Sequence, residues 1–121
     1  MPETPAVCIV DDDRDVRMSL ESFLRSVGAK VRTFDSAESF LGFESSGETG
    51  CLVTDLHMPG MGGLALQEEL VRRGRSYPVI VMTAFPTAEA KAASASFGAA
   101  DFFVKPVDPE LLLERVEELL A

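Results

Sequence analysis

Aspartate, threonine and lysine side chains stand at the ends of short apolar runs along this chain. The run at residues 6–10 ends at three consecutive aspartates, and later runs end at single polar residues that can bind ions or phosphate. These residues are Asp11, Asp12, Asp55, Thr83 and Lys105. If these residues lie together, the carboxylates of the three aspartates raise one another's pKa and destabilise the fold unless a cation balances their charge. Mg2+ suits such a site, because it uses one or two carboxylates, keeps water ligands and leaves room for phosphate oxygens.

Each of these residues, taken alone, has an ordinary structural explanation. Residues 11–13 could simply cap a helix, since aspartate is favoured at that position. Asp55 could begin a loop, Thr83 could be a plain strand residue, and Lys105 could be a solvated surface lysine. Their occurrence at successive run ends favours a joint site, where the lysine and the threonine hydroxyl would bind a phosphoryl group. The backbone carbonyl of His57 could add a metal ligand, while its side chain is expected in an exposed loop.

Strand-length apolar runs alternate with helix-length amphipathic stretches five times along the chain. The expected strands cover residues 6–10, 30–34, 51–55, 79–83 and 102–104. The expected helices lie at residues 13–28, 36–43, near 66–74, 86–97 and from 108 onward, with N-caps at Asp13, Ser36 and Asp108. The two glycine-rich segments 44–50 and 58–63 are expected to be loops.

The alternation predicts an α/β fold. Strands that are apolar throughout, each separated by a helix, are typical of a parallel sheet covered on both faces. Five such units predict a flavodoxin-like, doubly wound (βα)5 domain with strand order 2-1-3-4-5. In that order the first and third strands are neighbours, and their carboxyl ends bring the aspartates together. Residues 1–121 are expected to form this one domain, with no repeat, linker or output domain.

Composition excludes several classes of function. The chain has 11 Lys+Arg against 20 Asp+Glu, a formal charge of -9, and no basic cluster, so this domain is not expected to bind nucleic acid. No apolar run approaches the ~20 residues that span a bilayer, and the N-terminus lacks the pattern of a signal peptide. The expected location is the cytoplasm. Cys8 and Cys51 are interpreted as buried thiols rather than as a metal or redox pair.

The same residues give the chain a family resemblance. It resembles the receiver domain of two-component response regulators, in the motifs at residues 10–13, 53–63, 81–84, 98–102 and 104–106. These cover nearly the whole chain, in order and at the right intervals. The stretches at residues 36–41 and 55–63 are most similar to the FixJ-type subgroup, which usually carries a DNA-binding helix-turn-helix after the receiver. The chain would then either be a receiver that controls such a domain or a single-domain receiver acting through protein contacts.

The resemblance implies roles for the site residues. Asp55 would accept a phosphoryl group from a sensor histidine kinase or phosphotransfer protein, and Thr83 and Lys105 would bind the phosphoryl oxygens. The domain would be no enzyme beyond self-phosphorylation and autodephosphorylation at Asp55. The resemblance also implies an Mg2+ site, made by Asp11, Asp12, Asp55 and the backbone carbonyl of His57. The Lys105–Pro106 bond would be cis, as is usual in the family.

The resemblance implies a switch as well. Phe102 would rotate inward when Thr83 moves toward the phosphoryl group, although sequence alone favours Phe102 as a plain core residue. The affected surface, formed by the fourth helix, fifth strand and fifth helix, would contact a partner or a second copy of the chain. Phe85 either shields the acyl phosphate from water or packs against the fourth helix.

Three other functions are less consistent with the sequence. A Mg2+-dependent phosphohydrolase would need a cap domain and an acidic residue at the position of His57. A flavodoxin-like electron carrier would need a phosphate-binding loop where this chain has aspartates. A receiver-like binding module without phosphorylation would not need to retain Asp11, Asp12, Asp55, Thr83 and Lys105.

Overall fold

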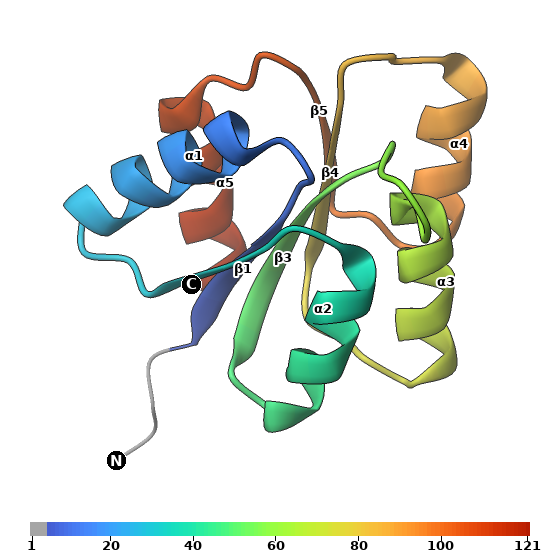
Figure 1. The fold of residues 1–121 in the computed structure, drawn as a ribbon, viewed down its shortest axis with the longest axis horizontal. Helices are drawn as coiled ribbons and strands as arrows, with labels where there is room; N and C mark the ends of the chain where they lie inside the picture. Colours follow the sequence, from blue (N-terminus) through green and yellow to red (C-terminus); the bar gives the residue numbers. More distant parts are fainter. Residues whose placement is uncertain (1–4) are drawn as a thin grey trace.

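The computed structural model describes residues 5–121, in which five parallel strands form one sheet in the order β2-β1-β3-β4-β5 (Figure 1). The strands are β1 (Ala6–Val10), β2 (Val31–Phe34), β3 (Thr49–Asp55), β4 (Val79–Thr83) and β5 (Asp101–Val104). The helices are α1 (Arg14–Ser26), α2 (Ala37–Phe43), α3 (Gly63–Arg72), α4 (Ala88–Ser96) and α5 (Pro109–Leu120), with a short 3-10 helix, η1 (Glu44–Ser46). The predicted fold class and strand order are confirmed.

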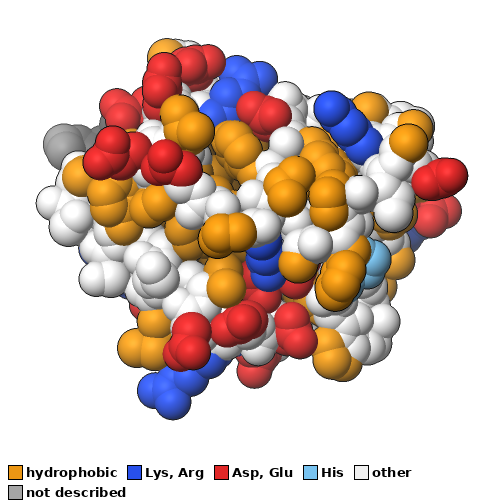
Figure 2. Space-filling model, turned by 90° about the horizontal axis from the view of Figure 1, so that it is seen from above, with side chains coloured by type: hydrophobic (Ala, Val, Ile, Leu, Met, Phe, Trp, Pro, Cys, Tyr) orange, Lys and Arg blue, Asp and Glu red, His pale blue; other side chains and the backbone are white. Residues whose placement is uncertain are grey.

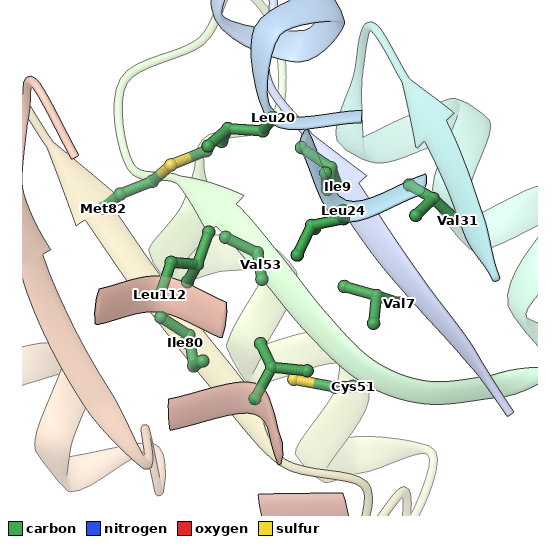
Figure 3. Packing of buried hydrophobic residues seen from close by; sticks show 11 residues of the cluster. Val7, Ile9, Leu20, Leu24, Val31, Cys51, Val53, Ile80, Met82 and Leu112 are labelled. Atoms are coloured by element: carbon green, nitrogen blue, oxygen red, sulfur yellow. The ribbon is translucent and has the colours of Figure 1, made fainter. Parts of the chain in front are cut away.

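Helices cover both faces of the sheet, and a hydrophobic core lies on each side. Figure 1 shows α1 and α5 on one side and α2, α3 and α4 on the other. Alternate residues of a strand point to opposite faces, so Val7 and Ile9 join one core while Cys8 and Val10 join the other. The first core adds Leu20 and Leu24 from α1, Leu112 and Val116 from α5, and residues of β2, β3 and β4; Figure 3 shows most of it.

Capping residues set the starts of three helices where the sequence predicts them. The Asp13 side chain accepts hydrogen bonds from the first turn of α1, and Ser36 does the same for α2. Asp108 caps α5, which begins at Pro109, where a missing N–H costs nothing. These caps fix where each helix leaves the edge of the sheet that carries the predicted site.

Several predicted boundaries need correction. Helix α4 begins at Ala88 rather than at Pro86, because Thr87 has an extended backbone and its side chain caps the Ala90 N–H. Strand β3 begins at Thr49 rather than at residue 51, since Thr49 already pairs with Ala6 across an irregularity in register. Strand β5 begins one residue earlier than predicted, β2 one residue later, and the loop predicted at residues 44–50 contains η1.

The two cysteines are buried and free, as predicted. Burial raises the pKa of both thiols, that of Cys51 to about 12. Cys8 belongs to the core beneath α2 and α3, whereas Cys51 belongs to the core beneath α1 and α5. Because they face opposite sides of the sheet, they cannot form a disulfide or share a metal.

Glu44 in η1 forms an ion-pair cluster that is not predicted from the sequence. Its side chain has no exposed surface and accepts hydrogen bonds from Arg73, Arg75 and Tyr77, at 2.7–3.0 Å. The cluster ties the end of α2 to the connection between α3 and β4.

Among residues 5–121, no helix is long and apolar enough to cross a membrane.

Candidate functional site: an acidic cleft at the carboxyl edge of the sheet

Three aspartates meet where β1 and β3 end. Val10 pairs with Thr54, so the residues that follow them along the two strands, Asp11 and Asp55, lie side by side. Asp11 is fully buried, Asp55 is 5% exposed, and Asp12 is exposed. Each offers a carboxylate oxygen, and the three oxygens lie within 4.8 Å of one another. Figure 2 looks onto this edge and shows a recessed basic side chain with acidic side chains on one side of it and apolar side chains around it, and the histidine further along the same face.

Lys105 reaches the same point from the loop after β5. Its Nζ lies 2.6 Å from Asp11 Oδ2 and donates a hydrogen bond of 3.1 Å to Asp55 Oδ2. Burial opposes the charge of Lys105, but the contacts with the two carboxylates outweigh it and hold the lysine pKa above its ordinary value. Burial also raises the pKa of Asp11, although Lys105 opposes that change. The peptide bond between Lys105 and Pro106 is cis, as the resemblance implied.

Thr83 ends β4, next to β3, and is fully buried. Its carbonyl accepts a hydrogen bond of 2.8 Å from the Lys105 N–H, and its Oγ1 accepts one of 3.0 Å from the Phe85 N–H. A hydroxyl can donate while it accepts, so the contact with the Phe85 N–H leaves the hydroxyl hydrogen of Thr83 for another acceptor.

His57 lies at the rim of the cleft in the loop after β3 and is exposed, as predicted. Its N–H donates a weak hydrogen bond of 3.4 Å to Asp55 Oδ1. Its ring meets the ring of Phe85 edge-to-face, with centroids 5.6 Å apart and an interplanar angle of 79°. Phe85 is itself 68% exposed, so it stands at the rim with His57 instead of being buried against α4.

Phe102 is the site residue whose sequence interpretation needs correction. It is half-buried and absent from both hydrophobic cores, whereas its neighbour Phe103 packs against the core beneath α1 and α5. Phe102 instead lines two hollows between β5 and α4, of about 180 and 270 Å³. The prediction of a plain core residue is therefore wrong, and the side chain has open space beside it.

The residues of the cleft fit a hard divalent cation such as Mg2+. Three carboxylates face a single lysine, which leaves excess negative charge in a partly buried place. Asp11 Oδ2 is buried and accepts no hydrogen bond within residues 5–121, because Lys105 approaches it as an ion pair outside hydrogen-bond geometry. An oxygen ligand of this kind is what Mg2+ prefers, and the exposed Asp12 leaves the cleft open to solvent.

Two further residues support the cleft, and neither is predicted from the sequence. Arg17 of α1 donates a hydrogen bond of 2.8 Å from its guanidinium to the backbone carbonyl of Asp11. Glu38 of α2 accepts one of 3.3 Å from the N–H of Met61, in the loop after Asp55. Neither contact follows from spacing along the chain, because each depends on how a helix packs beside the edge of the sheet.

Comparison with known proteins agrees with this geometry. The sequence model of the protein family described as the response regulator receiver domain matches residues 7–117 of this chain. The transcriptional regulatory protein FixJ of Azorhizobium caulinodans is 41% identical over the whole chain, which covers 57% of that protein. The transcriptional regulatory protein TdiR of Thauera aromatica is 41% identical over 95% of the chain, covering 51% of that protein. The chain thus spans about half the length of these curated relatives.

Solved structures give the same result. The crystal structure of FixJ-N superposes with a TM-score of 0.88 at 36% identity, covering 99% of this chain and 95% of that one. The response regulator StyR superposes with a TM-score of 0.85 at 40% identity, covering 98% of this chain and 60% of that one. With an acidic cleft, a lysine and a threonine at the expected strand ends, the chain belongs to the receiver-domain family of two-component response regulators.

Proposed function

We propose that Asp55 is the phosphoacceptor of this receiver domain and that Mg2+ assists its phosphorylation. The observation that carries the proposal is the contact of Lys105 with Asp55 and Asp11, inside a cluster of three carboxylates. Lys105 places a positive charge beside Asp55, whose side-chain oxygen would attack phosphorus. The proposed donor is the phosphohistidine of a sensor histidine kinase or phosphotransfer protein, met in the cytoplasm.

The chemical step is an in-line displacement at phosphorus. A bond forms between an Asp55 carboxylate oxygen and phosphorus while the bond from phosphorus to the histidine nitrogen breaks, and the histidine keeps that electron pair. Mg2+, when bound by Asp11, Asp12, Asp55 and the carbonyl of His57, would neutralise charge on the phosphoryl oxygens. Lys105 donates to one of those oxygens in place of its present contacts. The Thr83 hydroxyl donates to another.

The phosphoryl group would then act through Thr83 and Phe102. Movement of Thr83 toward the new acceptor opens space that Phe102 can enter, which shifts the population of two surface states. The proposed responsive surface is the α4-β5-α5 face. Among the described residues, α4 buries only Ser94 and contributes nothing to either hydrophobic core, so little packing resists its displacement.

We propose that this face forms a phosphorylation-dependent homodimer and controls a transcriptional output domain. The support for an output domain is that the relatives named as transcriptional regulators are about twice the length of this chain, and the support for the choice of face is the weakly packed α4. A Phe102→Ala variant should accept phosphate as the parent does but lose phosphate-driven association. Sedimentation of both proteins with and without phosphodonor checks this, and unchanged association in the variant would refute the switch.

Phosphorylation itself is tested with acetyl phosphate. The parent and Asp55→Asn would be incubated with and without Mg2+, and their intact masses compared. A gain of one phosphoryl group only in the parent, and only with Mg2+, is the expected result. No gain in a folded parent would reject phosphorylation and leave a binding module.

A further inference from the structure

Residues 56–62 connect Asp55 to α3, and we call them the phosphoacceptor loop. Backbone contacts close its base. The Gly63 N–H donates a hydrogen bond of 3.0 Å to the Leu56 carbonyl. A Cβ at Gly63 would lie 2.4 Å from the Asp55 carbonyl oxygen, so only glycine permits this approach. The base of the loop is thus fixed against the backbone of the phosphoacceptor.

A side chain from another element holds the tip of this loop. Glu38, in the first turn of α2, accepts a hydrogen bond of 3.3 Å from Met61 N–H through its Oε2. The same oxygen lies against Gly60, whose φ is +76°, and a Cβ there would be 2.6 Å away from it. Within residues 5–121, this is the one side-chain hydrogen bond to residues 58–62 from outside the loop. Met58 and Met61 also pack against the core beneath α2 and α3.

The geometry points to Glu38 as a positioning residue for Mg2+ binding, an inference that rests on the proposed function. Within residues 5–121, the Glu38 hydrogen bond runs to the loop backbone and not to Asp11, Asp12 or Asp55, so Glu38 would act through the loop that carries His57. A loop already in its binding conformation does not have to be ordered when the ion arrives. If only a fraction of molecules has that conformation, the apparent dissociation constant rises in inverse proportion to the fraction.

Glu38 could also affect Mg2+ through its negative charge alone, and three variants separate the two effects. Glu38→Ala removes both the acceptor and the charge, and should weaken Mg2+ binding about threefold to tenfold. Glu38→Gln removes the charge but keeps an acceptor oxygen, and should stay within about twofold of the parent. Glu114→Ala removes one exposed carboxylate from α5, far along the chain from the loop, and should leave binding unchanged.

Two readouts decide the matter. Titration calorimetry of the whole chain with MgCl2 gives the affinities, and amide hydrogen exchange at Met61 without Mg2+ reports the loop itself. Faster exchange and weaker binding in Glu38→Ala, both restored in Glu38→Gln, support the inference. Equal weakening of Mg2+ binding in both Glu38 variants would overturn the inference and show that the charge of Glu38 matters instead. Unaltered Mg2+ binding in Glu38→Ala would overturn it and show that Glu38 has no role. A parent that binds no Mg2+ would overturn the metal site itself, while Met61 exchange still shows whether Glu38 holds the loop.

Discussion

Replacing Glu44 with glutamine should destabilise the domain more than any change to an exposed ion pair. The Glu44 side chain is fully buried and accepts four hydrogen bonds, from Arg73, twice from Arg75, and from Tyr77. Glutamine keeps one acceptor oxygen but turns an NH2 group toward the guanidinium groups. The substitution therefore removes the compensating charge and leaves two arginines facing a donor.

The magnitude follows from how far the partners reach solvent. Removing one member of a fully buried ion pair costs about 3–5 kcal/mol. The Arg73 and Arg75 side chains are 29% and 38% exposed, so water can partly replace the lost carboxylate. We therefore expect a loss of about 2–3 kcal/mol in the free energy of unfolding. For a domain of this size that corresponds to a fall in Tm of about 8–12 °C.

Urea and thermal unfolding at pH 7 measure this loss. Glu21→Gln is the matched control, because it breaks the exposed pair with Arg25 and should cost less than about 0.5 kcal/mol. If Glu44→Gln costs no more than this control, the buried cluster is not a source of stability and the reasoning fails.

The cost of Glu44→Gln should also depend on pH. Burial alone would raise the pKa of Glu44, but hydrogen bonds from Arg75, Arg73 and Tyr77 outweigh it and hold the pKa below its ordinary value. A carboxyl with a depressed folded pKa contributes stability that is present above its unfolded pKa, about 4.3, and is lost as pH falls through the folded pKa. The difference in the free energy of unfolding between parent and Glu44→Gln should therefore become smaller below about pH 4.

Three other substitutions give separate predictions. Asp12→Asn relieves repulsion in the acidic cluster, so without metal the Tm of the variant should be a few degrees above that of the parent. At high Mg2+ the Tm of the variant should be below that of the parent, because the variant has lost a ligand. A lower Tm than the parent in both conditions would contradict this. Phe85→Ala removes the exposed ring at the rim and should speed loss of the acyl phosphate, followed by mass; an equal or slower rate would contradict shielding. Gln67→Leu breaks a buried hydrogen bond from the Gln67 amide to the Ser94 carbonyl, which still accepts a bond from the Ala99 N–H. The substitution also removes the buried Gln67 amide oxygen, which has no partner within the described residues. Its unfolding free energy should change by less than about 1 kcal/mol, and a loss above about 2 kcal/mol would show that the bond to α4 is strongly stabilising.

The sheet and the site could be predicted because their signals are local. Uninterrupted apolar runs mark the strands, and the strand order puts their polar ends at one edge. Caps such as Asp13 and Ser36 are local as well, since each side chain bonds to a backbone N–H within three residues. The clustering of four candidate site residues could be predicted for the same reason, because each ends a strand or directly follows one: Asp11, Asp55, Thr83 and Lys105.

What could not be predicted depends on contacts between distant segments. The partners of Glu44 lie 29–33 residues further along the chain, so a segment rich in Ser, Gly and Glu looked like a plain loop. Glu38 meets the N–H of Met61, 23 residues further on. Two adjacent phenylalanines, Phe102 and Phe103, carry no signal of which one faces the core. The register and the neighbouring helix decide together. Phe103 pairs with Met82 and faces the core beneath α1 and α5. Phe102 pairs with the buried Val81 on the opposite face, where the hollows beside α4 leave it half-buried.

The position of the phosphoryl group tests the central claim most directly. The protein would be treated with acetyl phosphate and Mg2+, reduced with borohydride to convert an aspartyl phosphate to homoserine, and mapped by peptide mass spectrometry. We expect homoserine at residue 55 and at no other aspartate, and none when Mg2+ is omitted. Homoserine at residue 11 or 12 with residue 55 unchanged, or label that does not depend on Mg2+, would contradict the assignment of Asp55 as the phosphoacceptor.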